Sequence, residues 1–177
     1  MGTGPTISVI IPTVNEASEL PETLRHVRAI PEVGEIIVVD GGSTDTTCEI
    51  AREHDCILIE AKPSRGHQLR LGAEQATGEI VLLLHADTWL PENAGHAIIE
   101  CLGNPLVVAG GFHKTFRDSN GYIPCSRLRH EFFCRVMKSI YGDQGIFVRR
   151  KVLEKVGGVP NVPLMEEFEL CKKLSAE

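Results

Sequence analysis

The sequence predicts an α/β fold in which a mostly parallel central sheet is covered by helices on both faces. Apolar segments of strand length alternate with amphipathic segments of helix length through about the first 105 residues, which is the pattern of a parallel sheet. The strand segments are rich in Val and Ile and lack polar alternation, as expected where both faces are buried. Polar residues follow several of these segments directly. Because ligands of such sheets bind beyond the carboxyl ends of the strands, we expect a ligand site along one edge.

The first helix and its flanking strands follow from periodicity. Residues 7–12 and 35–40 are apolar runs of strand length. Between them, Leu20, Leu24 and Val27 recur at i, i+4 and i+7, which places them on one face of a helix. The chain therefore opens with a strand, a helix and a second strand.

The next segments continue the alternation. Thr46 and Glu49 have the spacing of a capping box at the start of a short helix. Residues 56–60 and 80–84 are predicted to be further strands, and the helix between them is expected to stop at Gly78 as a C-terminal cap.

A fourth helix should begin near Pro91 and end at residues 103–105. Its expected packing face consists of Ala94, Ala97, Ile98, Cys101 and Leu102. After residue 105 the regular alternation of strand and helix segments ends. The remaining predicted elements are a longer strand at 106–116, a basic amphipathic helix at 126–140, a short strand at 144–150, a short helix at 151–158 and a final helix at 163–177.

Length and composition indicate a single globular domain. The chain has 177 residues, of which 42% are hydrophobic, enough for one core. No apolar run reaches the roughly 20 residues that a membrane span needs. The six cysteines occur singly, and no apolar leader precedes them, which favours reduced thiols in a cytoplasmic protein.

Charge is distributed unevenly around the net value of −6. Residues 1–112 hold 6 Lys or Arg against 16 Asp or Glu, whereas residues 113–155 hold 10 against 4. This pattern argues against general nucleic-acid binding and suits a site for a cation and a phosphate together. The basic residues are either a solvated face or contacts for a diphosphate or an anionic, lipid-linked acceptor. They include Arg127, Arg129, Arg135, Lys138, Arg149, Arg150 and Lys151.

Two acidic positions at strand ends are candidate ligand contacts. Asp40 precedes two glycines and either forms the turn or accepts hydrogen bonds from a nucleotide's base or ribose. Glu16 follows Asn15 after the first strand and either starts the helix or lines a base pocket on the same edge. The glycines form neither a dinucleotide fingerprint nor a P-loop.

His85 and Asp87 flank Ala86 immediately after an apolar strand. In an extended chain these two side chains project the same way. Asp87 is placed to hold a divalent ion that bridges two phosphates, and the alternative is that it or Thr88 caps the following helix. For His85, a hydrogen-bonded structural role and a metal-ligand role both stay open.

Two adjacent acids, Glu166 and Glu167, begin the last predicted helix. Acids are favoured in a first helical turn by the helix dipole, which explains one of them structurally. The functional alternative is a general base. Neighbouring helical residues point about 100° apart, so at most one of the two serves a given site well.

Four segments in this order resemble the family 2 glycosyltransferases. They are SVIIPTVNEA, EIIVVDGGSTDTT, ATGEIVLLLHADTWLP and the run from GDQGIFVRR to PLMEEFEL. The resemblance extends from about residue 7 to residue 171 and implies the GT-A fold of nucleotide-diphospho-sugar transferases, a Rossmann-like α/β/α sandwich. The HADT, GDQG and PLMEE versions resemble a bacterial subgroup associated with arsenosugar biosynthesis, which indicates relatives and not a substrate.

The resemblance also implies residue roles. Pro12, Thr13 and Glu16 match the segment that lines the base and ribose, and Asp40 matches the aspartate that contacts the base. His85, Ala86 and Asp87 occupy the place of the D-x-D motif, whose last aspartate holds Mn²⁺ or Mg²⁺ against the diphosphate. Glu167, or else Glu166, matches the catalytic base, and Arg65 matches an arginine near the donor.

Three departures from the family pattern set further expectations. His85 removes one carboxylate from the metal motif, and Glu167 is one methylene longer than the usual aspartate. Relatives continue beyond the last helix, so part of the acceptor side is expected outside this chain. We therefore treat residues 1–177 as one domain, with nucleotide binding in about residues 6–105 and the acceptor side in about residues 106–177.

The resulting hypothesis is a metal-dependent, inverting glycosyltransferase that moves a sugar from a nucleotide-diphospho-sugar donor to an acceptor hydroxyl. The acceptor is a small molecule or a lipid-linked one, and the protein is expected in the cytoplasm or peripherally at the inner membrane face. A nucleotidyltransferase is one alternative, although no glycine-rich basic loop follows the first strand. A non-catalytic nucleotide-binding module is the other.

Overall fold

The computed structural model of the chain describes residues 4–112, 144–162 and 165–176. Its six-stranded sheet consists of β1 (Ile7–Thr13), β2 (Val33–Asp40), β3 (Ile57–Glu60), β4 (Ile80–Leu83), β5 (Ala109–Gly110) and β6 (Ile146–Arg149). The strand order is β3-β2-β1-β4-β6-β5. The first four strands are parallel, and β6 pairs antiparallel with both β4 and β5. The predicted α/β fold with a mostly parallel sheet is confirmed.

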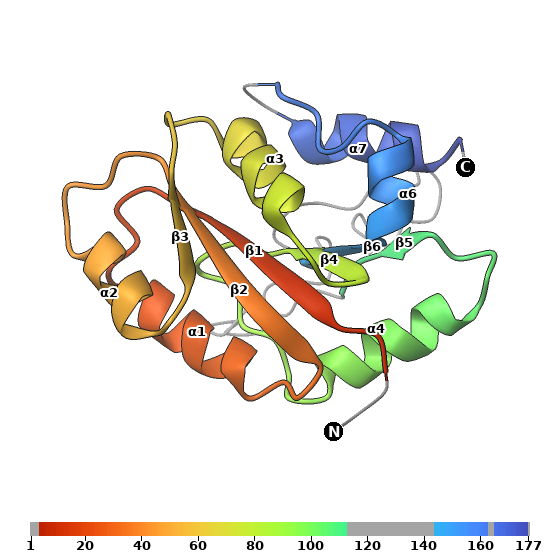
Figure 1. The fold of residues 1–177 in the computed structure, drawn as a ribbon, viewed down its shortest axis with the longest axis horizontal. Helices are drawn as coiled ribbons and strands as arrows, with labels where there is room; N and C mark the ends of the chain where they lie inside the picture. Colours follow the sequence, from red (N-terminus) through yellow and green to blue (C-terminus); the bar gives the residue numbers. More distant parts are fainter. Residues whose placement is uncertain (1–3, 113–143, 163–164, 177) are drawn as a thin grey trace, which may run out of the picture.

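Helices cover both faces of this sheet (Figure 1). Their bounds are α1 (Leu20–Arg28), α2 (Thr47–Glu53), α3 (Arg65–Gln75), α4 (Ala94–Gly103), α6 (Arg150–Lys155) and α7 (Glu166–Leu174). The core residues of α1, α2 and α4 pack on one face of the sheet, and those of α3, α6 and α7 pack on the other. The fold is therefore a three-layer sandwich.

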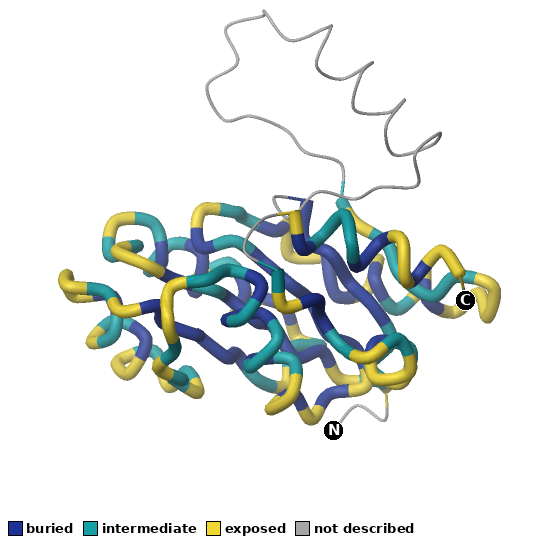
Figure 2. The backbone as a smooth tube through the Cα atoms, turned by 90° about the horizontal axis from the view of Figure 1, so that it is seen from above, coloured by how far each residue is buried: buried dark blue, intermediate teal, exposed yellow. Residues whose placement is uncertain are grey.

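Successive apolar residues of a strand alternate between the two cores. In β1, Val9 and Ile11 pack with Leu24 of α1, whereas Ile10 packs with Leu69 of α3. All five residues are at most 5% exposed. Figure 2 shows the buried backbone in dark blue along the strands, which explains why these strands carry no polar alternation.

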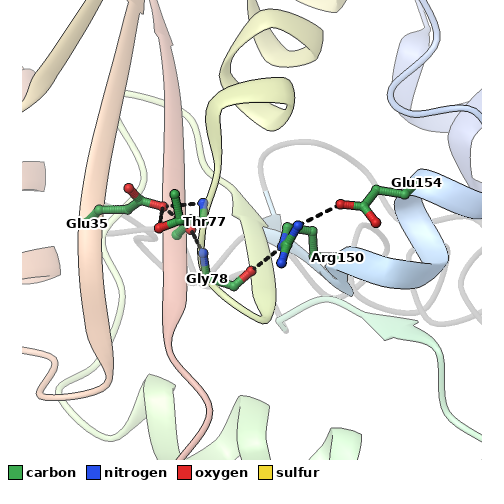
Figure 3. Close-up of polar contacts among 6 residues, drawn as sticks. Glu35, Thr77, Gly78, Arg150 and Glu154 are labelled. Carbon is green, nitrogen blue, oxygen red and sulfur yellow. Dashed lines mark hydrogen bonds and ion pairs between the residues drawn. The ribbon is translucent and has the colours of Figure 1, made fainter.

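A polar cluster ties the layers together at the amino-terminal end of β4 (Figure 3). Glu35 accepts hydrogen bonds from the main-chain nitrogen of Thr77 at 2.7 Å and from its hydroxyl at 3.0 Å. Arg150 donates from Nε to the carbonyl oxygen of Gly78 at 2.8 Å and pairs with Glu154 at 2.7 Å. Arg150 has a structural role here, and it lies at the opposite end of β4 from Asp87, the predicted metal contact.

Arg149 has a similar structural role. It is paired with Ile80 in the sheet and donates to the carbonyl oxygens of Val107 and Asn104, each at 3.4 Å. The predicted basic helix at 126–140 and four of its basic residues lie outside the described residues.

Two local predictions about helix ends were wrong. Gly78 does not have the left-handed φ of a C-terminal cap. Helix α3 already ends at Gln75. The absence of a side chain at Gly78 instead allows close packing, because a Cβ there would lie 2.6 Å from Ser8 Oγ. Thr46 occupies the N-cap position of α2 but makes no side-chain capping bond.

The predictions for residues 91–116 also need correction. Helix α4 begins at Ala94, and Ala97 and Cys101 are exposed instead of packing inward. In place of a strand over 106–116, the described part contains β5 with only two residues. None of the four cysteines in the described ranges is in a disulfide, and one of them, Cys171, is buried. Among the same residues, no helix is long and apolar enough to span a membrane.

Candidate functional site

A cleft of about 220 Å³ lies where the loops after β1 and β4 meet the first turns of α3. Its lining consists of Pro12, Thr13, Val14, Glu16, Arg65, Gln68, His85, Ala86 and Asp87. Every predicted nucleotide or metal contact except Asp40 is in this set. The predicted bases, Glu166 and Glu167, lie outside the lining, and both pair with Arg65, which belongs to it. The site assignments stay predictions, but the fold brings most of them together.

The segment that carries Asp87 is fixed on both sides by helix α1. The hydroxyl of Thr23, which is fully buried, donates to the carbonyl oxygen of Ala86 at 2.5 Å. The ring of His26 stacks on Trp89 with centroids 5.1 Å apart. Asp87 lies exposed between these two anchors. The orientation of its peptide group therefore depends on Thr23.

Neither Asp87 nor Thr88 caps the following helix, because α4 begins at Ala94 with Asn93 as its N-cap residue. The amide of Thr88 donates to the carbonyl oxygen of His85 at 3.2 Å, which turns the chain after the strand. The helix-capping alternative for Asp87 is thus wrong.

The loops after β1 and β2 are joined by side-chain hydrogen bonds. Asn15 has a left-handed φ of 55°. Its side-chain oxygen accepts a hydrogen bond from the main-chain nitrogen of Thr44 at 2.8 Å, and its main-chain nitrogen donates to Ser43 Oγ at 2.8 Å. The amide of Glu16 donates to Thr47 Oγ1 at 2.9 Å. These bonds make the two loops one unit that places the Glu16 carboxyl at the cleft.

Asp40 organises the second of these loops from inside. It is 2% exposed and accepts hydrogen bonds from the amides of Gly42 at 2.8 Å and Ser43 at 2.7 Å, from Thr13 Oγ1 at 3.0 Å, and from Ser43 Oγ. Burial alone would raise the pKa of Asp40, but the bonds from Ser43, Gly42 and Thr13 outweigh it and hold this pKa below its usual value. The structure supports its turn-forming role, and a base contact stays a prediction.

The cleft concentrates negative charge. The pKa of Glu16 is raised, first because the carboxyl is partly buried and then because Asp87, Glu19 and Asp45 are nearby. Among the described lining residues, Arg65 is the only Lys or Arg, and it already pairs with two glutamates. Like charges held close together favour a cation between them.

The acidic pair at the start of α7 is bound by one guanidinium. Arg65 donates from Nε to Glu166 Oε1 and from Nη2 to both carboxylate oxygens of Glu167, each at 3.1 Å. The Glu166 side chain is 2% exposed and that of Glu167 is 13% exposed. Both also line a small apolar cavity together with His85. Glu167 is thus the more accessible acid.

A metal ion fits this cleft only with help from a ligand. No group of three or more His, Cys, Asp or Glu in the described ranges is placed to hold a metal. Asp87 supplies a hard carboxylate oxygen on an open surface, which suits Mg²⁺ or Mn²⁺ with further oxygens from phosphates. The donor set therefore fits a metal bound jointly by protein and diphosphate.

Sequence reasoning missed two residues that position the site. Gln68 is 2% exposed, and its Nε2 donates to the carbonyl oxygens of Thr13 at 2.9 Å and Val39 at 2.8 Å, which joins the ends of β1 and β2. Thr23 holds Ala86 as described above. Both are polar residues on the apolar faces of helices, and this break in the pattern was the available signal.

Comparison with known proteins identifies relatives of this chain. The family model described as Glycosyl transferase family 2 matches residues 8–157. Glycosyltransferase AglE of Haloferax volcanii is 33% identical over 179 residues, covering 89% of this chain and 57% of that protein. An undecaprenyl-phosphate 4-deoxy-4-formamido-L-arabinose transferase of Pseudomonas paraeruginosa is 32% identical over 125 residues, covering 64% and 37%. The chain thus spans about half the length, or less, of these relatives.

Solved structures agree with the fold. A mannosyltransferase of Pyrobaculum calidifontis, solved with GDP-Man and Mn²⁺, superposes with a TM-score of 0.76 at 25% identity, covering 97% of this chain and 52% of that one. TarS of S. aureus, residues 1–349, gives a TM-score of 0.77 at 19% identity, covering 96% and 55%. At 19% identity, the similarity to TarS supports the fold and nothing further.

Proposed function

We propose that this chain, which belongs to glycosyl transferase family 2, binds a nucleotide-diphospho-sugar in its cleft and transfers the sugar to an acceptor hydroxyl. The observation that carries the proposal is the composition of the cleft. Strand-end residues for a base and ribose, Pro12, Thr13 and Glu16, lie beside the exposed carboxylate of Asp87. The Mn²⁺ and GDP-Man named for the P. calidifontis structure support the same ligand class.

A divalent metal, Mn²⁺ or Mg²⁺, belongs to this proposal. Asp87 would hold it together with the diphosphate, and the bound metal would supply positive charge for the leaving nucleoside diphosphate. Thr23 and the stack of His26 on Trp89 keep the Asp87 segment in place. His85 is separated from Asp87 by Ala86 and lines the small cavity that Glu166 and Glu167 also line. It has a structural role in this proposal.

Glu167 is the proposed general base. It is more exposed than Glu166, which is buried against Arg65. Glu167 would take the proton of the acceptor hydroxyl as the oxygen attacks the anomeric carbon. A single displacement of this kind inverts the configuration at that carbon.

The donor side is tested by calorimetry with uridine and guanosine diphosphates. We expect one of them to bind in the presence of Mn²⁺, and Asp87→Asn to weaken that binding at least tenfold. Glu92→Gln, an exposed acid near the same loop, is the matched control and should bind as the wild type does. Failure of both nucleotides to bind, or normal binding by Asp87→Asn, would remove the metal assignment.

The base is tested by turnover. Glu167→Gln should lose most of the turnover while its nucleotide affinity stays within about twofold, because the amide keeps the shape but accepts no proton. Full activity in Glu167→Gln with loss in Glu166→Gln would move the role to Glu166. Binding without any donor hydrolysis or transfer would favour the non-catalytic module.

The acceptor and the cellular place are also proposals. The name of the P. paraeruginosa relative includes an undecaprenyl phosphate, which supports a lipid-linked acceptor. A place in the cytoplasm or at the inner membrane face stays a prediction from the sequence. The arsenosugar-associated subgroup stays a prediction from the motifs. Transfer assays with a polyprenyl phosphate and with soluble sugar acceptors would separate these cases.

A further inference from the structure

We infer that Arg65 is a positioning residue that holds the acidic pair of α7 at the edge of the donor cleft. The inference rests on the proposed function, because it takes Glu167 as the base. Arg65 belongs to both regions: it lines the cleft and it binds Glu166 and Glu167. Arg65 affects the reaction by positioning Glu167, and this role does not depend on a contact between Arg65 and the donor.

The guanidinium contacts determine where Glu167 can lie. Glu166 is buried and binds Nε of Arg65, so it anchors the inner edge of the guanidinium group. Nη2 then holds both oxygens of Glu167 at 3.1 Å. Because a guanidinium is planar and rigid, fixing one edge fixes the direction of the other. A lysine ammonium at this place keeps the charge but loses this geometry.

Two backbone features accompany the side-chain contacts between Arg65 and α7. A Cβ at Gly66 would lie 2.6 Å from the carbonyl oxygen of Val162 and 3.2 Å from Glu166 Cβ, so only glycine permits this approach. Met165 adopts a left-handed φ of 61° just before the acids, a conformation that costs energy in a residue with a side chain. The chain thus accepts local constraints that place Glu166 and Glu167 against the start of α3.

The arrangement has a consequence for the role of Arg65 in donor binding. Its charge is already opposed by two carboxylates, so it contributes little net attraction for a diphosphate. Loss of Arg65 should therefore affect turnover more than nucleotide affinity. A residue whose main task is to bind the donor would show the opposite order.

A double-mutant cycle on Arg65 and Glu167 tests the inference. Arg65→Lys should lower kcat about 100-fold, the order expected when a reacting group is displaced by about 1 Å, while the nucleotide Kd changes less than threefold. Arg65→Lys combined with Glu167→Gln should be no slower than Glu167→Gln alone. Arg70→Lys, on the same helix and paired with Glu74, is the control and should leave both values unchanged. Independent, multiplying losses in the cycle, or a larger loss in Kd than in kcat, would overturn the inference.

A measurement without turnover separates this inference from the proposed function. In Arg65→Met, hydrogen exchange of the α7 amides over residues 168–174 should accelerate about tenfold or more relative to wild type, with exchange in α1 unchanged. Exchange in α7 equal to wild type would show that Arg65 does not hold the helix. If wild type transfers sugar but the cycle is additive, the proposed function stands and the inference fails. If wild type neither binds nucleotide nor turns over, the proposed function fails and exchange alone decides the role of Arg65.

Discussion

Asp40 offers a quantitative test of how the nucleotide-side loop is built. Asp40→Ala removes four hydrogen bonds and leaves the amides of Gly42 and Ser43 without their carboxylate partner. Gly42 is exposed and Ser43 is half-buried, so water replaces part of the loss. Taking roughly 1.5 kcal/mol for each of the two amide bonds, the lower end of the range for hydrogen bonds to charged groups, we expect the free energy of unfolding to fall by about 3 kcal/mol.

Asp40→Asn separates shape from charge. Its carbonyl oxygen can accept from the two amides while its NH₂ group donates to the hydroxyls of Thr13 and Ser43, which are able to accept. The geometry is then kept and only the added strength of a charged acceptor is lost, about 1 kcal/mol. Urea unfolding followed by the fluorescence of Trp89, the single tryptophan, measures both variants.

The pH dependence has a definite sign. Because the pKa of Asp40 is lowered in the folded protein, its charge stabilises the fold fully above the unfolded pKa of about 3.9. That stabilisation is lost as pH falls through the folded pKa. The difference between wild type and Asp40→Asn should therefore be constant from pH 5 to 7 and shrink below about pH 4.

Two results would refute this reasoning about Asp40. One is an Asp40→Ala variant as stable as wild type, and the other is a difference that grows on acidification. The same proteins also decide the base-contact prediction. If Asp40 binds a nucleobase, Asp40→Asn loses at least tenfold in nucleotide affinity, and if it only forms the turn, affinity stays within about twofold.

Three further predictions concern packing and backbone around the site. Thr23→Val should lower Mn²⁺-dependent nucleotide affinity severalfold in calorimetry, because the Ala86 carbonyl loses its 2.5 Å bond, whereas Thr23→Ser should stay near wild type. Gly72→Ala should reduce stability by about 1–3 kcal/mol in urea unfolding, because a Cβ would lie 2.4 Å from Ile10 Cγ2. The matched Gly103→Ala meets nothing within 4 Å and should cost nothing. Met165→Val should lower the Tm by an amount that corresponds to about 1–2 kcal/mol, because a β-branched residue fits φ of 61° poorly, and Met165→Asn should not.

The sheet and the edge where the cleft lies were predictable because they depend on local pattern. Val and Ile runs such as residues 35–40 mark strands buried on both faces, and parallel strands deliver their following residues to one edge. That rule alone places Glu16 and Asp87 near each other, although 70 residues separate them in the sequence, and both line the cleft.

Contacts that depend on three-dimensional approach were not predictable. Nothing near Arg65 in the sequence points to Glu166, which lies 101 residues away. The requirement for glycine at position 78 comes from Ser8 on β1, so the local pattern predicted a capping role that Gly78 does not have. Ala97 and Cys101 fit a helical face by spacing but are exposed, because the buried stripe of α4 is centred on Gly95, Ile98 and Leu102 and leaves them at its edge.

The charges in the cleft lead to one more prediction, in which a substitution acts in opposite directions with and without metal. Glu16 and Asp87 line the cleft, and Arg65 is outnumbered by its two glutamates. Two like unit charges about 5 Å apart at an effective dielectric of 20 repel by about 3 kcal/mol. A nucleoside diphosphate without metal therefore meets net repulsion, and a divalent ion reverses it.

Asp87→Asn should thus weaken nucleotide binding in Mn²⁺ but strengthen it severalfold in EDTA, because it removes one of the repelling charges. Calorimetry of both proteins under both conditions, at constant ionic strength, gives the four affinities. A merely structural role for Asp87 predicts weaker binding by the variant in both conditions. A reversal of order between Mn²⁺ and EDTA is expected only if this carboxylate acts as the protein's partner for the cation.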